Sequence, residues 1–142
     1  MKIIIKFIII LLTLCTTLYA ECKIYKGKYT SYSNQVATFD NGKIFRGKTT
    51  SYSNQIGIIE DYKIFTGKTS SYSNQIGSFN EGKIYKGKNT SYSNQVGIIE
   101  DGKIYKGKYI SYSNQIGIVD GGDSCASAGA AFLLLLWVWQ ES

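Results

Sequence analysis

The stretch from Lys83 to Gly102 reads KIYKGKNTSYSNQVGIIEDG, and it is the fourth of five successive units of the same length. The units begin at Lys23, Lys43, Lys63, Lys83 and Lys103, with no insertion or deletion between them. Each unit contains a Gly-Lys pair followed by the sequence Ser-Tyr-Ser-Asn-Gln. So regular a period of 20 residues indicates a repeat architecture, in which every unit forms one supersecondary element.

Each unit is expected to form β-structure. Runs such as 55–59 and 103–106 are short and rich in β-branched and aromatic residues. The dipeptides Asn41-Gly42, Glu81-Gly82 and Asp101-Gly102 suit a two-residue hairpin turn, which requires positive φ angles. Asp61-Tyr62 occupies the same position, and tyrosine would be strained there. We therefore expect the second hairpin to use a different turn.

A two-residue turn also fixes the hairpin register. In the first hairpin it pairs Asp40 with Lys43, Thr38 with Phe45 and Val36 with Gly47 on one face, and Phe39 with Ile44 and Ala37 with Arg46 on the other. Both faces carry apolar groups. We expect the first face to point inward, because it holds an aliphatic residue at Ile56, Ile76, Val96 and Ile116 and an aromatic residue at Tyr25, Phe45, Phe65, Tyr85 and Tyr105.

Residues 1–20 resemble a cleavable signal peptide. A basic start at Lys2 and Lys6 precedes an apolar stretch over 7–12, and Ala20 suits the position before the cleavage site. A retained membrane anchor and a lipoprotein are the alternatives. Threonines interrupt the apolar run that an anchor needs, and Leu14 stands before Cys15 where a lipoprotein needs a small residue. We expect export to the periplasm or secretion, and no membrane span after cleavage. The full chain has a formal net charge of +6, which favours weak association with anionic surfaces.

Cleavage leaves two cysteines, Cys22 and Cys125, and an even number in an exported chain predicts one disulfide. A single hairpin is only marginally stable in water, so the five hairpins must pack as an open stack or a closed ring. Only a ring brings the two cysteines within the ~5.5 Å Cα separation that a disulfide needs. The spacing therefore favours a closed all-β ring of about ten strands over 21–125.

The tail over 126–142 contains Ala126–Trp139, which is apolar on every side and free of charge. It is too short to span a bilayer as a helix. A segment that is apolar on every side is expected to be buried within the fold. We predict a hydrophobic C-terminal segment, helical in form, that plugs the centre of the ring. A tail that dips into a membrane and a hydrophobic edge strand are the alternatives, and the former would suit Trp137 and Trp139.

The repeat sequence together with Gly-Ala-Ala-Phe-Leu-Leu-Leu-Leu over 129–136 resembles the five-fold β-flower proteins. This resemblance covers Lys23 to about Leu136. It implies a shallow symmetric barrel of hairpin petals, similar to the tubby-type barrel with its central hydrophobic helix, and it brings no established activity. Tubby-like relatives suggest lipid headgroup binding at the level of the fold alone. Ala37, Thr38 and Tyr62 depart from the usual residues. MORN and choline-binding repeats are similar in part, but neither accounts for the cysteines and the leucine-rich tail.

The chemistry of the repeats argues against an enzyme. The chain has no histidine, the commonest general base and metal ligand. Most acidic residues fall at hairpin turns, where solvent surrounds them, and the hydroxyls of Ser-Tyr-Ser-Asn-Gln have no base beside them. We expect no catalytic residues, no metal and no cofactor.

The placement of the lysines is the best functional clue. A strand rises ~3.3 Å per residue, so Lys28 lies about 17 Å from Lys23 and away from the acidic turns. A closed ring would gather on one rim the lysines Lys28, Lys48, Lys68, Lys88 and Lys108 with the tyrosines Tyr32, Tyr52, Tyr72, Tyr92 and Tyr112. We predict that this rim binds an anionic envelope lipid or polysaccharide. The alternative is a structural or protein-protein interaction module with no small ligand, whose lysines serve solubility. Nucleic acid is an unlikely partner.

Overall fold

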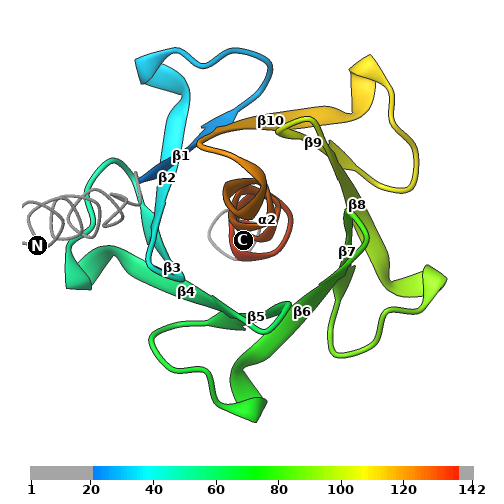
Figure 1. Ribbon diagram of the computed structural model, residues 1–142, viewed down its shortest axis with the longest axis horizontal. Helices are drawn as coiled ribbons and strands as arrows, with labels where there is room; N and C mark the ends of the chain where they lie inside the picture. Colours follow the sequence, from blue (N-terminus) through cyan, green and yellow to red (C-terminus); the bar gives the residue numbers. More distant parts are fainter. Residues whose placement is uncertain (1–20, 138–142) are drawn as a thin grey trace, which may run out of the picture.

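In the computed structural model, residues 21–137 are described. They form a closed antiparallel barrel of ten strands, β1-β10-β9-β8-β7-β6-β5-β4-β3-β2, with a helix in its centre (Figure 1). The strands are β1 (Cys22–Lys26), β2 (Gln35–Asp40), β3 (Lys43–Arg46), β4 (Gln55–Glu60), β5 (Lys63–Thr66), β6 (Gln75–Asn80), β7 (Lys83–Lys86), β8 (Gln95–Glu100), β9 (Lys103–Lys106) and β10 (Gln115–Asp120). The predicted closed all-β ring of hairpins is confirmed. The expected signal peptide over 1–20 lies outside the described residues.

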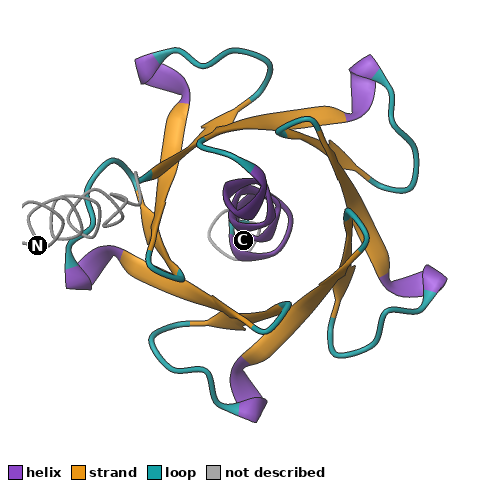
Figure 2. Cartoon of the chain, viewed as in Figure 1, coloured by secondary structure: helices purple, strands orange, loops and turns teal. Residues whose placement is uncertain are grey.

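Two kinds of connection alternate around the barrel. Two-residue turns join β2 to β3, β4 to β5, β6 to β7 and β8 to β9 at one rim, which we call the turn rim. At the other rim, eight-residue loops extend outward, and each ends in a 3₁₀ turn (Figure 2). We call these petal loops, and they cover residues 27–34, 47–54, 67–74, 87–94 and 107–114. Their 3₁₀ turns are η1 (Tyr32–Asn34), η2 (Tyr52–Asn54), η3 (Tyr72–Asn74), η4 (Tyr92–Asn94) and η5 (Tyr112–Asn114).

The predicted register of the first hairpin is confirmed, with Asp40 opposite Lys43 and Thr38 opposite Phe45. The expectation of a different turn in the second hairpin is wrong. Asp61 and Tyr62 both adopt left-handed φ angles, 50° and 61°, as Asn41 and Gly42 do in the first hairpin. The ladder of β4 with β5 imposes this turn, because Glu60 pairs with Lys63 in the same register as the equivalent residues of the other hairpins. Tyrosine accepts the strained conformation rather than changing the register.

The inward face of the barrel is the opposite of the one we expected. The core cluster contains the fully buried side chains Ile24, Ile44, Ile64, Ile84 and Ile104, and it does not contain the aromatic residues beside them in the strands. Those aromatic rings are buried on the outer face, on the side from which the petal loops project. The sequence pattern misled because a β-bulge shifts the alternation, so that Phe45 pairs with Gln55 while its neighbour Ile44 pairs with Gly57. Ile56 is the extra residue, and it packs against the edge of the core.

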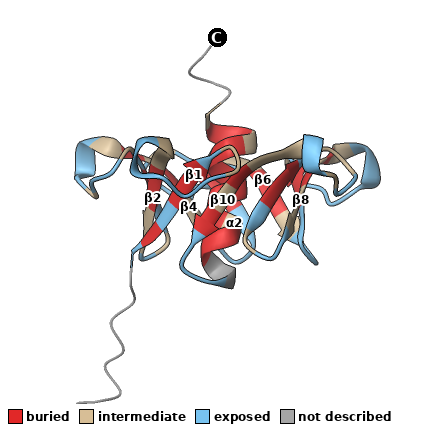
Figure 3. Cartoon of the chain, turned by 90° about the horizontal axis from the view of Figure 1, so that it is seen from above, coloured by how far each residue is buried: buried red, intermediate tan, exposed pale blue. Residues whose placement is uncertain are grey.

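The C-terminal segment enters the barrel from the turn rim as α2 (Asp123–Ala131) and continues as the π-helix η6 (Phe132–Leu136). It begins earlier than the residue 126 predicted for the plug. Its side chains are buried along most of its length, as the side view in Figure 3 shows. The predicted helical plug is thereby confirmed, and the edge-strand alternative is wrong. Within residues 21–137, no helix combines the length and apolar character needed to cross a membrane.

Successive residues of the plug contact successive repeats of the barrel wall, one residue for each repeat. A Cβ atom added at Gly117 would meet the side chain of Leu133, and one added at Gly97 would meet Leu134. In the same way Gly77 faces Leu135 and Gly57 faces Leu136. Glycine is needed at these positions because the wall and the leucines are in direct contact. Consecutive plug residues therefore meet consecutive repeats around the ring.

This arrangement explains why the helix changes type at Phe132. An α-helix has 3.6 residues per turn, whereas a π-helix, closed by i→i+5 bonds, has ~4.4 and comes closer to one residue for each of five repeats. Trp137 N donates such a bond to Phe132 O at 2.8 Å. The rings of Phe132 and Trp137 are in contact, with centroids 5.3 Å apart and planes tilted by 52°. By the same progression, Phe132 and Trp137 both correspond to the first repeat. That repeat has Ala37 where the other four have glycine.

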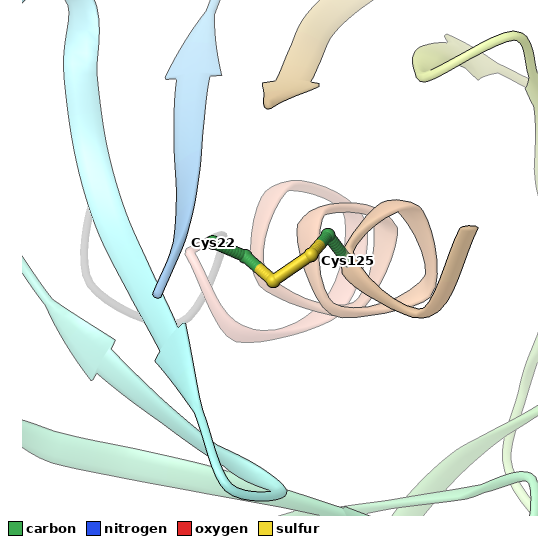
Figure 4. Close-up of a disulfide and its surroundings, with 2 residues drawn as sticks. All are labelled: Cys22 and Cys125. Atoms are coloured by element: carbon green, nitrogen blue, oxygen red, sulfur yellow. A yellow bond between two sulfur atoms is a disulfide. The ribbon is translucent and has the colours of Figure 1, made fainter. Parts of the chain in front are cut away.

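The disulfide between Cys22 and Cys125 is present, with a Cα–Cα separation of 5.5 Å. It links the first residue of β1 to the first part of α2 (Figure 4). Closure of the barrel is completed by the ladder of β1 with β10, in which Lys23 pairs with Asp120 and Tyr25 with Ile118. The start and the end of the repeat array therefore meet, as the cysteine spacing predicted.

Candidate functional site

The rim that carries the petal loops, which we call the petal rim, brings together the predicted lysines and tyrosines. Each lysine places its ammonium over the tyrosine ring of the preceding petal loop, with Nζ 3.2–3.7 Å from the ring centroid. The pairs are Lys48 on Tyr32, Lys68 on Tyr52, Lys88 on Tyr72, Lys108 on Tyr92 and, across the point of closure, Lys28 on Tyr112. We call these ten residues the lysine–tyrosine ring.

These contacts hold each ammonium in place without neutralising it. A cation over an aromatic face is attracted by the ring quadrupole, and the interaction is worth ~0.5–1 kcal/mol at exposed sites. The five tyrosines remain 66–77% exposed, so one edge of every pair faces solvent. An ammonium held in this way still has N–H groups available for an anion.

Polar contacts hold the petal loops in position. Gly47 N donates to Val36 O at 2.8 Å, and the equivalent bond recurs in all five repeats. Gln55 and Gln95 are buried, and their amides donate to Gly67 O and Gly107 O of the neighbouring petal loops. In the first repeat Thr38 makes this link instead, since its hydroxyl donates to Gly47 O at 2.9 Å. The ring is therefore built on an ordered scaffold.

A second group of cations, which was not predicted from the sequence, lies inside the lysine–tyrosine ring. Lys26, Arg46, Lys86 and Lys106 are exposed and lie at the petal-loop ends of their strands. Their cross-strand partners are Gly117, Ala37, Gly77 and Gly97, the positions that face the plug. Directly paired residues point to the same face of a sheet. These four side chains therefore form a collar around the inner mouth of the barrel, and Thr66 occupies the fifth position.

The register could have revealed this collar, because the sequence already pairs Ala37 with Arg46. The face was assigned to the outside, and the collar was missed for that reason. The half-buried Leu134 and Trp137 of the plug lie within the same mouth. The petal rim thus presents an apolar centre, an inner collar of cations and an outer lysine–tyrosine ring.

Charge is strongly segregated between the two rims. No petal loop contains an acidic residue. Every acidic residue among 21–137 lies near the turn rim, at Glu21, Asp40, Glu60, Asp61, Glu81, Glu100, Asp101, Asp120 and Asp123. The same rim carries Lys23, Lys43, Lys63, Lys83 and Lys103, and Asp40 and Glu60 are the cross-strand partners of Lys43 and Lys63. With nine acidic residues and five lysines the turn rim has a formal charge of −4, whereas the petal rim carries cations alone.

The described residues contain no group of three or more His, Cys, Asp or Glu side chains placed to hold a metal ion. The arrangement on the petal rim is suited to binding, since it offers fixed cations, phenolic hydroxyls and the Ser and Asn side chains of the 3₁₀ turns. It includes no pairing of a nucleophile with a base.

The chain matches the model of one protein family over most of its length. Residues 22–131 match the family described as "6-fold beta flower protein". No curated protein and no solved structure matches the chain. The resemblance stated from the sequence had the correct kind of fold but named a five-fold family, whereas the matching family is described as six-fold; this chain closes its barrel with ten strands from five units. Beta-flower proteins form a structural repeat fold and not a known enzyme family. The chain belongs to the 6-fold beta flower family, as a member with ten strands.

Proposed function

We propose that this protein is a non-enzymatic, exported binding module whose petal rim holds an anionic component of the cell envelope, either lipid headgroups or an acidic polysaccharide. The observation that carries the proposal is the segregation of charge. The lysine–tyrosine ring and the inner collar place cations on one rim, and the petal loops of that rim contain no acidic residue.

The geometry of the ring supports binding to an extended surface or polymer rather than to one small molecule. The five lysines are spread around the whole rim, and each is fixed over a neighbouring tyrosine. Each ammonium can therefore contact a separate phosphate or carboxylate. Binding through many weak contacts of this kind gains affinity by multivalency and weakens as salt is added.

Export is supported by the disulfide between Cys22 and Cys125, since such bonds persist in oxidising compartments. The signal-peptide-like pattern over 1–20 also favours export. An envelope location would bring the petal rim close to anionic lipids and polysaccharides.

A structural or protein-interaction role is the second candidate, and one observation favours it. Each lysine–tyrosine pair links one petal loop to the next, so the same residues can serve to order the rim. In that case the lysines would matter for the stability of the loops and not for any anionic partner.

Binding to vesicles of anionic phospholipid and to purified lipopolysaccharide, measured at increasing salt, separates the two candidates. A variant with glutamine at Lys28, Lys48, Lys68 and Lys108 should lose at least about tenfold in affinity for the anionic partner. The matched control carries glutamine at Lys23, Lys43, Lys83 and Lys103, which removes the same charge from the turn rim and should bind like the parent. Equal binding by the two variants, or no binding by the parent at low salt, would reject the proposed function.

A further inference from the structure

Two departures from the repeat occur close together in space, and each opposes stability. Tyr62 stands where the other turns have Gly42, Gly82 and Gly102, and its φ of 61° is a left-handed conformation that glycine adopts without strain. The Tyr62 side chain is 77% exposed, so burial of the ring does little to offset this strain.

The second departure is Ser78, which replaces the isoleucine found at Ile58, Ile98 and Ile118. Ser78 is only 7% exposed, and its hydroxyl has no hydrogen-bond partner among the described residues. Thr38 at the same position of the first repeat donates to Gly47 O. A buried polar group without a partner destabilises a fold and requires an explanation.

Both residues line one cleft on the outer wall of the barrel, with a volume of about 550 Å³. Lys63 pairs directly with Ser78, and Phe79 N donates to Tyr62 O at 2.9 Å, so the second turn lies against β6. The opposite wall of the cleft is the petal loop that contains Lys88 and Ser91. Tyr62 and Phe79 also line a neighbouring hollow of about 430 Å³ at the turn rim.

The polar groups of the cleft converge from different elements. Lys63 of β5 and Lys88 of the fourth petal loop supply two cations, Gln75 supplies an amide, and Ser78 and Ser91 supply hydroxyls. Tyr62 supplies an exposed aromatic ring. An aromatic face packs well against the C–H face of a sugar ring, and the amide and hydroxyl groups are suited to its hydroxyls. The two ammoniums favour a ligand that also carries a negative charge.

We propose that this cleft binds a sugar that carries a carboxylate or a phosphate. Tyr62 stacks on the ring, Lys63 and Lys88 hold the anionic group, and Gln75, Ser78 and Ser91 bond the sugar hydroxyls. A rotation about the Cα–Cβ bond of Ser78 turns its unpaired hydroxyl toward the ligand. Asp61, which also lines the cleft, accepts a bond from a further hydroxyl. The cleft lies where the second, third and fourth repeats meet, and it shares only Lys88 with the lysine–tyrosine ring, so sugar binding is tested separately from the petal rim.

The test is isothermal titration of the disulfide-bonded protein with glucose 6-phosphate and with glucuronate, with glucose and inorganic phosphate as separate arms. We expect saturable binding of one or both anionic sugars, at least about tenfold tighter than either glucose or phosphate alone. No saturable binding of either anionic sugar, or equal binding of inorganic phosphate, would overturn the proposal.

Variants that restore the repeat sequence make the test sharper. Tyr62→Gly and Ser78→Ile should each raise the melting temperature by a few degrees and yet weaken sugar binding at least about tenfold. Lys63→Gln should weaken binding as well, whereas Thr38→Ile and Lys83→Gln at equivalent positions of other repeats should leave it unchanged. Unchanged binding in Tyr62→Gly and Ser78→Ile would show that the departures are not a ligand site. The glutamine variant of the petal rim retains Lys63 and Lys88, so a failure of the rim to bind does not affect this result.

Discussion

The one-residue-per-repeat contact between plug and wall predicts which pairs of substitutions compensate. In Gly77→Ala, the added Cβ would meet the Leu135 side chain and would lie 2.8 Å from Tyr85 O and 3.1 Å from the Ile64 Cδ1 atom. The leucine or the strand must move. Overpacking of this kind should lower the free energy of unfolding by ~1–3 kcal/mol.

Removal of the leucine produces the opposite defect. Leu135 is 6% exposed, and Leu135→Ala should lower the free energy of unfolding by ~2–5 kcal/mol because it leaves a cavity. When both changes are made, the alanine at position 77 gains the space that the leucine left. The double variant should therefore be more stable than the sum of the two losses predicts, by ~0.5–3 kcal/mol. The contact with Tyr85 O remains, so the compensation is partial.

Urea unfolding of the disulfide-bonded protein, followed by far-ultraviolet circular dichroism, measures these differences. The control combines Gly77→Ala with Leu133→Ala, since Leu133 faces Gly117 on another repeat. Its two effects should add within ~0.5 kcal/mol. Strict additivity in the Gly77 and Leu135 pair, or equal compensation by Leu133→Ala, would refute the assignment of plug residues to repeats.

Three further predictions concern the closure, the outer wall and the petal rim. Serine at Cys22 and Cys125 should lower the free energy of unfolding by up to ~4.7 kcal/mol, because the bond closes a loop of about 100 residues; unchanged stability in urea titrations would contradict this. Thr38→Val should lower stability by ~1 kcal/mol, since Gly47 O loses its donor, whereas Ser78→Val should not lower it; similar losses in both would count against the hydrogen-bond assignment. Tyr52→Leu should remove the ring-current shift of the Lys68 side chain in proton NMR spectra, and Tyr92→Leu should leave it intact; a Lys68 shift unaffected by either change would rule out the pairing.

Much of the fold could be predicted from the sequence because the repeat supplies its own register. The Asn41-Gly42 turn fixes the pairing of β2 with β3, and copies of it determine the other hairpins. The positions of Cys22 and Cys125 then distinguish a ring from an open stack. These predictions rest on local turn chemistry and on counting along the chain.

The inward face could not be predicted, because both faces of each hairpin are covered. The plug covers one face, and the aromatic residues are buried on the other, so apolar character does not distinguish them. The bulge beside Ile56 adds to the difficulty, since it breaks the alternation on which the prediction relied. The collar of Lys26, Arg46, Lys86 and Lys106 was missed as a direct result.

Features that depend on several repeats at once could not be predicted from the sequence either. The π-helical turn at Phe132 results from matching the plug to five repeats, and no local signal in 132–136 requires it. The tyrosine at position 62 shows the converse, because the sequence correctly indicated strain but the neighbouring ladder decided the turn. The lysine–tyrosine contacts likewise join residues of successive repeats.

Closure of the barrel underlies the plug, the collar and the petal rim, and NMR spectroscopy of the isotope-labelled, disulfide-bonded protein tests it most directly. A closed barrel predicts cross-strand NOEs between β1 and β10, with Lys23 opposite Asp120 and Tyr25 opposite Ile118, together with slow hydrogen exchange of the amides in that ladder. Strong NOEs within every hairpin but none between β1 and β10, with rapid exchange along both strands, would show an open array and contradict the account.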